Sequence, residues 1–420
     1  MGQAFSPLDE DLGLLPGELS PRVREGAVRL GSRMPFAQAA EELAAFWDVA
    51  VSEDTVRRMT EAAGAAYVAV QTQERDRIAR ELPVTPPGPG VQQVSLDGAM
   101  VPLVGGEWAE VKTAAIGTVV QEPGVDGTPE ARTRELSYFS RMAEVAVFSQ
   151  EAGVEFERRG TQTAETVVAV SDGALWIQGI VDTYRWDAVR VLDFPHAAEH
   201  LNRAAQAVFG SGTPEATAWF ERQRHALRHT GPEPVLEALR ALPVPTAPDP
   251  ATAARVRDEV LGYLEARREQ LRYPEFRAQG YPLGSGAVES ACKLVVEARM
   301  KGSGMHWARP NVNPMVALRT VLGNQRWPEA WPQIHRQLAR REAERRRARR
   351  LQRSPQIQAP APSPAPLHAT LLRSAARHLR AQEQDQSRLR PARVVDGRPT
   401  ASHPWKRFPS CRPRVHRGAS

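Results

Sequence analysis

Three acidic residues stand out because each one interrupts or ends an apolar stretch of the sequence. Asp97 lies inside the apolar run at 94–103, and Asp172 ends a second run that begins at residue 166. Glu289 lies about one turn inside a helix predicted after a Gly-Ser-Gly turn. A carboxylate buried without a partner is costly, and a metal ion or a cationic group removes that cost. The alternatives are local: Asp-Gly pairs that cap turns, and a surface Glu.

Together, three carboxylates at one place would suit two Mg²⁺ ions, with Mn²⁺ as a substitute, because hard divalent cations prefer oxygen ligands. Two such metals about 3.5–4 Å apart can activate a water or a 3′ hydroxyl and stabilise the leaving oxygen of a phosphodiester. That is the chemistry of strand cleavage and strand transfer. The spacing alone leaves open the alternative of three unrelated acids.

The elements predicted around these acids have the order of a ribonuclease H-like core. Three antiparallel strand patterns, at 91–104, 108–120 and 134–140, precede a helix at 143–158. A strand at 166–171, helix 174–184, strand 188–193 and helix 195–209 then follow. In such a core the first and fourth strands are adjacent, so Asp97 and Asp172 are expected at one sheet edge. A helix packed on the sheet would bring Glu289 to the same point.

The whole chain is predicted to be an α/β protein, with a ribonuclease H-like mixed sheet and flanking helices. The N-terminal part, 1–82, shows a helix-turn-helix pattern, in which Arg57 and Arg58 are candidates for DNA contact. Any helical hairpin gives a similar pattern, so this interpretation stays open. The remaining predicted parts are a linker at 83–90, the core at 91–209, a helical insertion at 210–280, the C-terminal part of the core at 281–332, and a basic, low-complexity, mostly disordered tail at 333–420.

The composition favours a soluble, cytoplasmic protein with an affinity for nucleic acid. The chain has 420 residues and a net charge of +6, and seven of the twelve residues at 339–350 are Arg. Such a density suits phosphate backbones, although a solvated basic helix is the alternative. Cys292 and Cys411 are the two cysteines, which argues against a disulfide framework or a cysteine-based zinc site. No apolar run of about 18 residues is present, so no membrane span is expected.

Other residues near the three acids are candidates for supporting roles. Asp193 is a candidate supporting acid, and His196 is expected to pack or to contact DNA, with metal ligation as the weaker alternative. Trp307 lies in a Gly-flanked loop, where an exposed ring would stack on a distorted DNA end and a core Trp is the alternative. Three cations are candidates for holding phosphates, with solvated helix charges as the alternative: Lys293, Arg299 and Lys301.

Four motifs in this order resemble bacterial insertion-sequence transposases, of the ISKra group in the Mutator-like superfamily of Asp-Asp-Glu enzymes. They are Val-Ser-Leu-Asp-Gly at Asp97, Val-Ser-Asp-Gly-Ala at Asp172, Leu-Asp-Phe-Pro-His-Ala-Ala-Glu-His-Leu at 192–201, and Gly-Ser-Gly-Ala-Val-Glu-Ser-Ala-Cys-Lys at 284–293. The similarity runs from about residue 20 to residue 331 and returns at 395–405.

This resemblance implies a ribonuclease H-like fold with a helical insertion before the final Glu, and Asp97, Asp172 and Glu289 as the catalytic triad. It also implies Mg²⁺-dependent cutting and joining at inverted-repeat ends by a nucleoid-associated homodimer or higher oligomer on DNA, with no membrane partner. The helix-turn-helix pattern lies close to the N-terminus, which raises the hypothesis that an upstream DNA-binding part is missing. Two other functions stay open: a non-catalytic DNA-binding regulator or decayed transposase, and a nuclease that cuts without joining.

Overall fold

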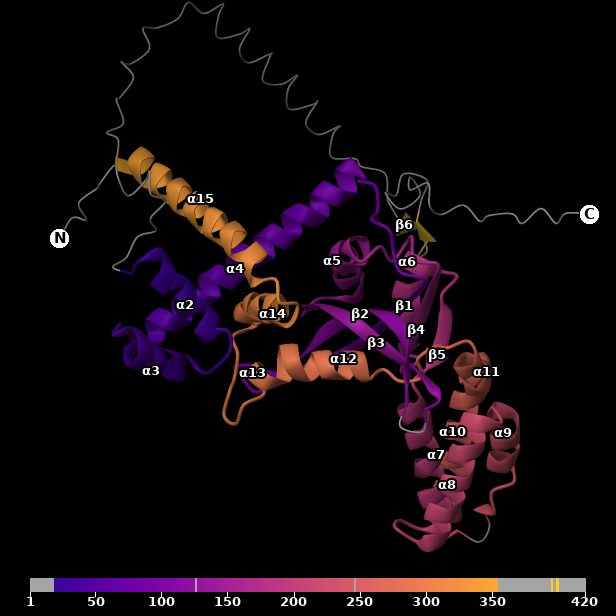
Figure 1. The fold of residues 1–420 in the computed structure, drawn as a ribbon. Coiled ribbons are helices and arrows are strands. Elements are labelled where there is room, and N and C mark those ends of the chain that lie inside the picture. Colours follow the sequence, from indigo (N-terminus) through magenta and orange to yellow (C-terminus); the bar gives the residue numbers. More distant parts are fainter. Residues whose placement is uncertain (1–18, 125–126, 245–246, 354–393, 396–397, 400–420) are drawn as a thin grey trace, which may run out of the picture. The chain divides into compact units, whose positions relative to one another are not determined.

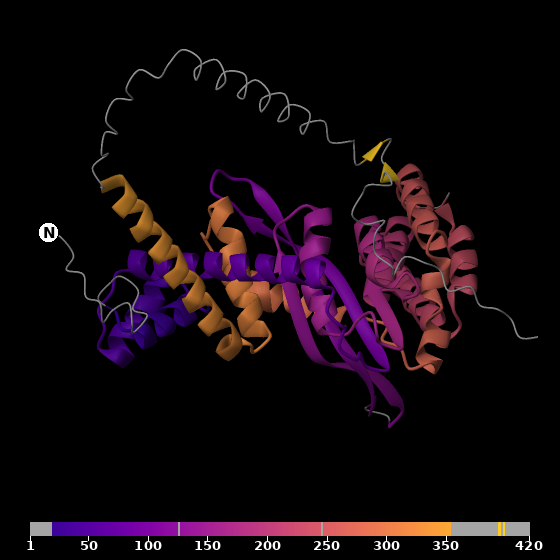
Figure 2. The same ribbon diagram turned by 90° about the horizontal axis from the view of Figure 1, so that it is seen from above.

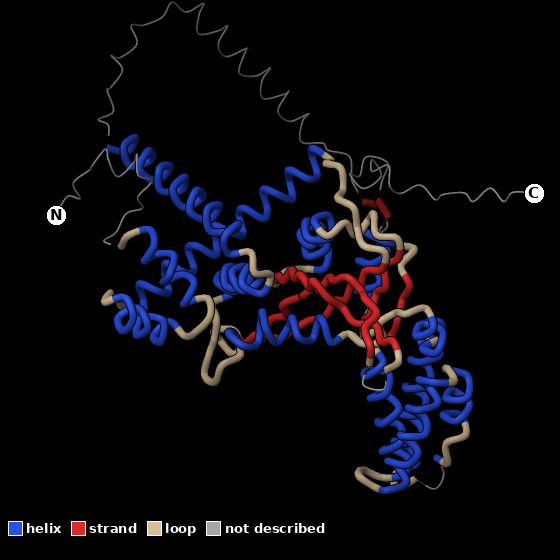
Figure 3. Tube along the Cα trace, in the orientation of Figure 1, coloured by secondary structure: helices blue, strands red, loops and turns tan. Residues whose placement is uncertain are grey.

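The computed structural model has an α/β fold, in which a mixed sheet is covered by helices on both faces (Figures 1 and 3). This coarse architecture agrees with the prediction and is compatible with a ribonuclease H-like core. The structure describes residues 19–124, 127–244, 247–353, 394–395 and 398–399. Within these ranges, no helix combines the length and the apolar character needed to cross a membrane.

Five strands of the described chain form the sheet, in the order β3-β2-β1-β4-β5. The first three pair antiparallel, while β4 and β5 run parallel to β1. Their bounds are β1 (Val91–Pro102), β2 (Trp108–Pro123), β3 (Pro129–Arg141), β4 (Thr166–Ser171) and β5 (Val189–Leu192). The β2–β3 hairpin is longer than predicted, because pairing continues to Pro123 and Pro129 through a stretch expected to be a loop.

The two faces of the sheet carry separate apolar cores. On one face, Val101 and Val111 pack against Val288, Val295 and Val316. The helices on this face are α12 (Gly286–Ala291), the π-helical segment η3 (Cys292–Glu297), α13 (Ala298–Met300) and α14 (Arg309–Gly323). The opposite face is covered by α5 (Val145–Arg158) and α6 (Leu175–Arg185), whose apolar residues pack on Leu96 and Ile116.

A helical segment follows β5 and extends the core beyond β4 and β5. Its residues form one apolar cluster with Val170 and Val191 of the sheet. The helices are α7 (Phe194–Phe209), α8 (Pro214–His229), α9 (Pro232–Arg240), α10 (Pro250–Glu265), η2 (Arg268–Leu271) and α11 (Tyr273–Ala278). We refer to α8 through α11 as the α8–α11 segment; it lies in sequence between α7 and α12, where a helical stretch was predicted.

The N-terminal region contains α2 (Pro21–Gly31), α3 (Phe36–Trp47) and the long helix α4 (Glu53–Glu81). Ser20 and Ser52 cap α2 and α4, as predicted, by accepting hydrogen bonds from backbone N–H groups of the first turn. Figure 2 shows α4 running from these helices toward the sheet. A Cβ on Gly64 would lie 2.2 Å from the carbonyl oxygen of Pro314, so α4 and α14 approach closely at this glycine.

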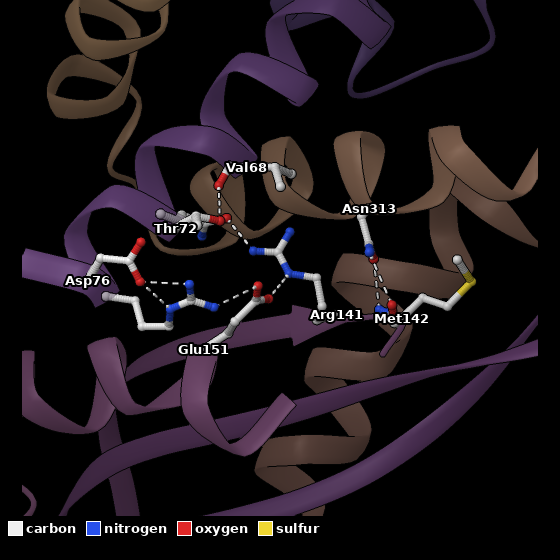
Figure 4. A network of polar contacts seen from close by, with 9 residues as sticks. Val68, Thr72, Asp76, Arg141, Met142, Glu151 and Asn313 are labelled. Atoms are coloured by element: carbon white, nitrogen blue, oxygen red, sulfur yellow. Dashed lines mark hydrogen bonds and ion pairs between the residues drawn. The ribbon is translucent and has the colours of Figure 1, made fainter. Parts of the chain in front are cut away.

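Buried charged groups attach α4 to the sheet (Figure 4). Arg141, at the end of β3, donates from Nε to Glu151 Oε2 at 2.6 Å and from Nη2 to Gln71 Oε1 at 2.8 Å. Glu151 of α5 also lies 3.8 Å from Arg75 of α4. Burial lowers the pKa of Arg141. One guanidinium therefore joins β3, α4 and α5.

The prediction that the chain is mostly disordered from residue 333 onward is wrong for its first part. Helix α15 (Trp327–Arg353) continues well past residue 332, where the folded part was expected to end. Ile334 of this helix is buried against Trp327 and Val28. The exposed part is stabilised by Arg and Glu pairs four residues apart, such as Arg340 with Glu344. The rest of the tail lies outside the described residues, except for a short antiparallel pair, β6 (Val394–Val395) with β7 (Arg398–Pro399). Residues 1–18 also lie outside them.

Candidate active site

Asp97 and Asp172 are placed next to each other by the parallel pairing of β1 and β4. The last pair of this ladder joins Val94 to Ala169, and each Asp lies three residues further along the sequence. Asp97 is half-buried on β1, and its Oδ1 accepts from Gly98 N at 2.7 Å. Asp172 is exposed just after β4, and its Oδ1 accepts from Ala174 N at 2.9 Å. Both therefore make the local turn contacts of the alternative interpretation and still share one sheet edge.

Glu289 comes close to Asp97 from α12, a helix far along the chain from β1 and β4. It is exposed on α12, and Ser285 Oγ lies 3.5 Å from its Oε1. One turn later, Cys292 is buried with its Sγ 4.0 Å from Asp97 Oδ2. This contact brings the start of η3, which directly follows α12, next to Asp97; in Figure 1, α12 runs along the sheet.

The pKa of Asp97 shows which acids lie near it. Burial raises the pKa of Asp97, and the neighbouring carboxylates of Asp172, Glu289 and Glu110 raise it further. Asp172 and Glu289, the other two acids selected from the sequence, therefore lie close enough to Asp97 for their charges to act on it. Glu110 on β2 is a fourth acid that the sequence reasoning missed; its signal was a carboxylate within a mostly apolar strand. Its Oε2 pairs with Lys112 Nζ at 2.6 Å.

The acids near Asp97 are of the residue type that binds hard divalent cations. Carboxylate oxygens are the ligands that Mg²⁺ prefers, and a cation between them would offset the repulsion that raises the pKa of Asp97. Across the described residues, no three or more His, Cys, Asp or Glu side chains are grouped closely enough to hold a metal ion. Asp172 and Glu289 therefore act on the charge of Asp97 from a distance, and a shared metal ion would require the three carboxylates to lie closer together.

Asp193 connects the end of β5 to the start of the Glu289 helix. It is buried, and its Oδ2 accepts from His196 N at 3.0 Å, which caps α7. Its Oδ1 accepts from Ser285 N at 2.6 Å. From the other side, Gln93 Nε2 donates to Gly284 O at 3.0 Å. Two side chains of the sheet region therefore hold the residues that lead into α12.

His196 lies against other aromatic rings and not against the three candidate acids. Its ring is half-buried, 4.9 Å from the ring of His200, and its Nδ1 lies 3.8 Å from Glu199. His200 stacks on Tyr263 at 4.1 Å. Burial, then the charges of His196 and nearby arginines, lower the pKa of His200 to about 4.

Tyr263 and Arg267 are site residues that the sequence reasoning missed. The Tyr263 hydroxyl donates to the carbonyl oxygen of Asp172, and Arg267 Nη2 donates to Gly173 O at 2.9 Å. The Arg267 guanidinium also lies 4.0 Å from the centre of the Tyr263 ring. Residues at the end of α10 and just after it thus hold the turn that follows β4. Tyr263 and Asp172 are 91 residues apart, and no local sequence pattern predicts their contact.

Two residues predicted to contact DNA, Trp307 and Arg299, are buried, so the predicted role is wrong for both. Trp307 is 6% exposed and donates from Nε1 to Met300 O at 3.2 Å, so its ring belongs to the apolar core and is not available to stack on a base. Arg299 is 3% exposed; it donates to Gly31 O and lies over the rings of Phe36 and Trp307. Burial lowers the pKa of Arg299 to about 10. Its guanidinium joins α13 to α2 instead of facing phosphate.

The other cations remain accessible. Lys293 is exposed one turn after Glu289, and Lys301 is exposed but pairs with Glu297 at 2.7 Å. On α4, Arg57 pairs with Asp54 and Glu61, and Arg58 pairs with Asp54 at 2.8 Å. Lys293 is therefore the cation best placed beside the candidate acids.

A second buried arginine stabilises the π-helical segment after Glu289. Arg319 of α14 donates from Nε to Val295 O at 3.3 Å and from Nη2 to Leu294 O. Its Nη1 donates to Ser32 O at 3.3 Å. A π-helix leaves the regular i→i−4 hydrogen-bond pattern, and such segments are frequent at functional sites. Arg319 gives these carbonyl groups a donor and ties the segment to the end of α2.

Comparison with known proteins does not provide a family for this chain. No protein-family model matches it, and a search of curated proteins finds no significant match. The fold, the motifs and the geometry of the acids are therefore the features of this chain that bear on its function.

Proposed function

We propose that this chain is a DNA transposase of an insertion sequence, which binds terminal inverted repeats and cuts and joins DNA strands with Mg²⁺. The observation that supports the proposal is that Asp172 and Glu289 both lie close enough to Asp97 to raise the pKa of its carboxyl. The proposal includes a ribonuclease H-like core, a helical insertion formed by the α8–α11 segment, and a helix-turn-helix within α2 to α4.

In this proposal Asp97, Asp172 and Glu289 hold the metal through their carboxylate oxygens. Bound Mg²⁺ supplies Lewis-acid stabilisation and a more acidic water. Asp97 is the least exposed of the three, and its partial burial already disfavours its charge in the absence of a cation. Asp193 and Gln93 hold the start of α12 and so set where Glu289 can reach. These residues position the acids without touching DNA.

The proposed reaction has two steps, strand cleavage and strand transfer. A water oxygen forms a bond to phosphorus at the element's end, the bond from phosphorus to the 3′ oxygen breaks, and that oxygen takes a proton. The freed 3′ hydroxyl then loses its proton and bonds to the phosphorus of a target phosphodiester, while the bond from that phosphorus to the target 3′ oxygen breaks and this oxygen takes a proton. The phosphates are contacted by exposed cations, for which Lys293, Arg57, Arg58 and Lys301 are candidates. The proposed assembly is a homodimer or higher oligomer on DNA in the nucleoid, because two ends must be paired.

The test uses the full chain with a labelled duplex carrying the inverted repeats that flank its gene. We expect Mg²⁺- or Mn²⁺-dependent nicking and strand-transfer products, and we expect Asp97→Asn to abolish both while DNA binding persists. Asp182→Asn is the matched control, since Asp182 is an exposed acid on α6 that pairs with Arg190. Cleavage by Asp97→Asn at the wild-type rate would refute the assignment, and cleavage without joined products would indicate a nuclease.

A second candidate function is a non-catalytic DNA-binding regulator or a decayed transposase. The turn contacts of Asp97 and Asp172 favour it, because each carboxylate already has a local structural role. In that case DNA binding would be unchanged in Glu289→Gln, and the wild type would show no metal-dependent cleavage.

A further inference from the structure

A cleft of about 550 Å³ opens between the β2–β3 hairpin and the α8–α11 segment. Its volume falls in the range of roughly 300–1,000 Å³ that is common for ligand sites. Three stretches of chain line it: residues 129–132 of the hairpin, 228–229 at the end of α8, and 274–283 from α11 onward. None of the candidate acids lines this cleft.

The cleft carries an excess of positive charge. Arg132 and Glu130 pair with each other at 2.8 Å, so their charges compensate. Arg228 and Arg277 are exposed, and within the described part of the chain neither is paired with a carboxylate. By contrast, Arg272, which precedes the same helix as Arg277, pairs with two acids. Two guanidinium groups therefore face the cleft without a counter-charge.

The contacts of these two arginines leave their charge available. The guanidinium of Arg228 lies 5.5 Å from the centre of the Phe194 ring. Arg277 Nη1 lies 3.3 Å from His229 Nδ1, and since a guanidinium only donates, His229 must accept at Nδ1 and carry its proton on Nε2. Partial burial and the neighbouring His225, Arg277 and Arg228 lower the pKa of His229, which keeps its ring neutral. His229 therefore adds a donor at Nε2.

We propose that this cleft binds a phosphate group of the DNA backbone through Arg228 and Arg277. The inference rests on the proposed function only for naming DNA as the source of the phosphate. A guanidinium presents its N–H groups in a planar fork that matches two phosphate oxygens, and a phosphate diester supplies the missing negative charge. The cleft is open and lies between two parts of the chain, which suits a strand passing through it.

One wall of the cleft continues along the chain into the residues that precede α12. Its wall at Gly280 accepts a hydrogen bond from Gln121 Nε2 at 2.8 Å, and Leu283 O accepts from Phe194 N at 2.9 Å. The next two residues, Gly284 and Ser285, are those held by Gln93 and Asp193 before α12 begins. A strand anchored in the cleft would therefore be held close to the start of the helix that carries Glu289.

The test compares two charge-matched double variants of the full chain. Arg228→Gln with Arg277→Gln removes both cleft charges, while Arg222→Gln with Arg255→Gln removes two exposed charges from α8 and α10 outside the cleft. Binding to a labelled DNA duplex is measured by fluorescence anisotropy without Mg²⁺, across a range of salt concentrations. All four positions are exposed, and thermal melting checks that each variant is folded.

We expect the cleft variant to bind DNA about tenfold more weakly than the wild type, as for the loss of a hydrogen-bonded charged contact. The slope of log affinity against log salt should become shallower by about one unit. The control variant should lose much less affinity. Equal losses in the two variants, or no DNA binding by the wild type, would overturn the inference. Because the measurement omits Mg²⁺, absence of cleavage by the wild type would contradict only the proposed function.

Discussion

Asp97 on β1 and Asp172 just after β4 each lie three residues beyond the pair formed by Val94 and Ala169 on these neighbouring strands. This register is what converts two acids separated along the chain into neighbours at one sheet edge. Glu289 is added by α12, and Cys292, which follows α12 at the start of η3, lies against Asp97. The candidate site is therefore a product of strand register and of one helix placed over it.

Asp97 should make stability depend on pH. Its pKa is raised in the folded state by burial and by Asp172, Glu289 and Glu110, so ionising Asp97 destabilises the fold. This penalty is absent below the pKa of an unfolded Asp, which is about 3.9, and it grows as pH rises toward the raised value. Asp97→Asn stays neutral at every pH. The melting temperature of this variant relative to the wild type should therefore be higher at about pH 7 than at about pH 3, and thermal melting at both pH values measures the difference.

Mg²⁺ provides the second arm of that experiment. A cation bound only by the folded state stabilises it by mass action. We expect added Mg²⁺ to raise the melting temperature of the wild type at neutral pH and to have little effect on Asp97→Asn. The same small response in both proteins would contradict metal binding at this edge.

Removing Asp193 should loosen the entry to α12. Asp193→Ala leaves two backbone N–H groups, those of His196 and Ser285, without their acceptor. A loss of about 2–4 kcal/mol in the free energy of unfolding follows from leaving buried donors unpaired. Asp249→Ala is the control, because Asp249 also caps a helix but at an exposed position, where the loss should be about 1 kcal/mol.

Cleavage separates the structural effect of Asp193 from its effect on the site. Under conditions where both variants stay folded, Asp193→Ala should cut DNA more slowly than Asp249→Ala, while the two bind DNA alike. Equal cleavage rates would show that the contact with Ser285 does not influence Glu289.

Tyr263→Phe tests whether the α8–α11 segment positions Asp172. The change removes the hydroxyl that donates to the Asp172 carbonyl but keeps the ring that packs on His200 and Arg267. Tyr184→Phe is the matched control, since its hydroxyl donates to Ser149 O at 2.6 Å on another helix. Each should lose about 1 kcal/mol of stability. A lower cleavage rate is expected only for Tyr263→Phe, and an equal rate in both would contradict a positioning role.

The contact between α4 and α14 gives a prediction about stability alone. A methyl group on Gly64 would overlap the Pro314 carbonyl, so Gly64→Ala should destabilise the fold by about 1–3 kcal/mol through overpacking. Gly179 lies in α6 with open space around its Cβ position, so Gly179→Ala should be stabilising by roughly 0.5–1 kcal/mol. Denaturant unfolding would measure both, and destabilisation of the same size in the two variants would contradict the packing argument.

Much of the architecture could be predicted from local patterns. Apolar strand patterns, the caps at Ser20 and Ser52, and the Pro- and Gly-rich linker located most elements within a few residues, since these signals depend on neighbours along the chain. The exception was α15, where an Arg-rich composition suggested disorder. The composition concealed Ile334, which is buried, and the Arg and Glu pairs that stabilise an exposed helix.

The sequence by itself determined the order of the elements, the four motifs and the identity of the three acids, because residue type and spacing are written along the chain. Tertiary structure alone decided which side chains meet. It paired Asp193 with Ser285 and Tyr263 with Asp172, added Glu110 beside Asp97, and buried the cations and the ring expected at the surface, Arg299 and Trp307. Such contacts join residues far apart in sequence, and they depend on how the helices pack on the sheet, which no local periodicity encodes.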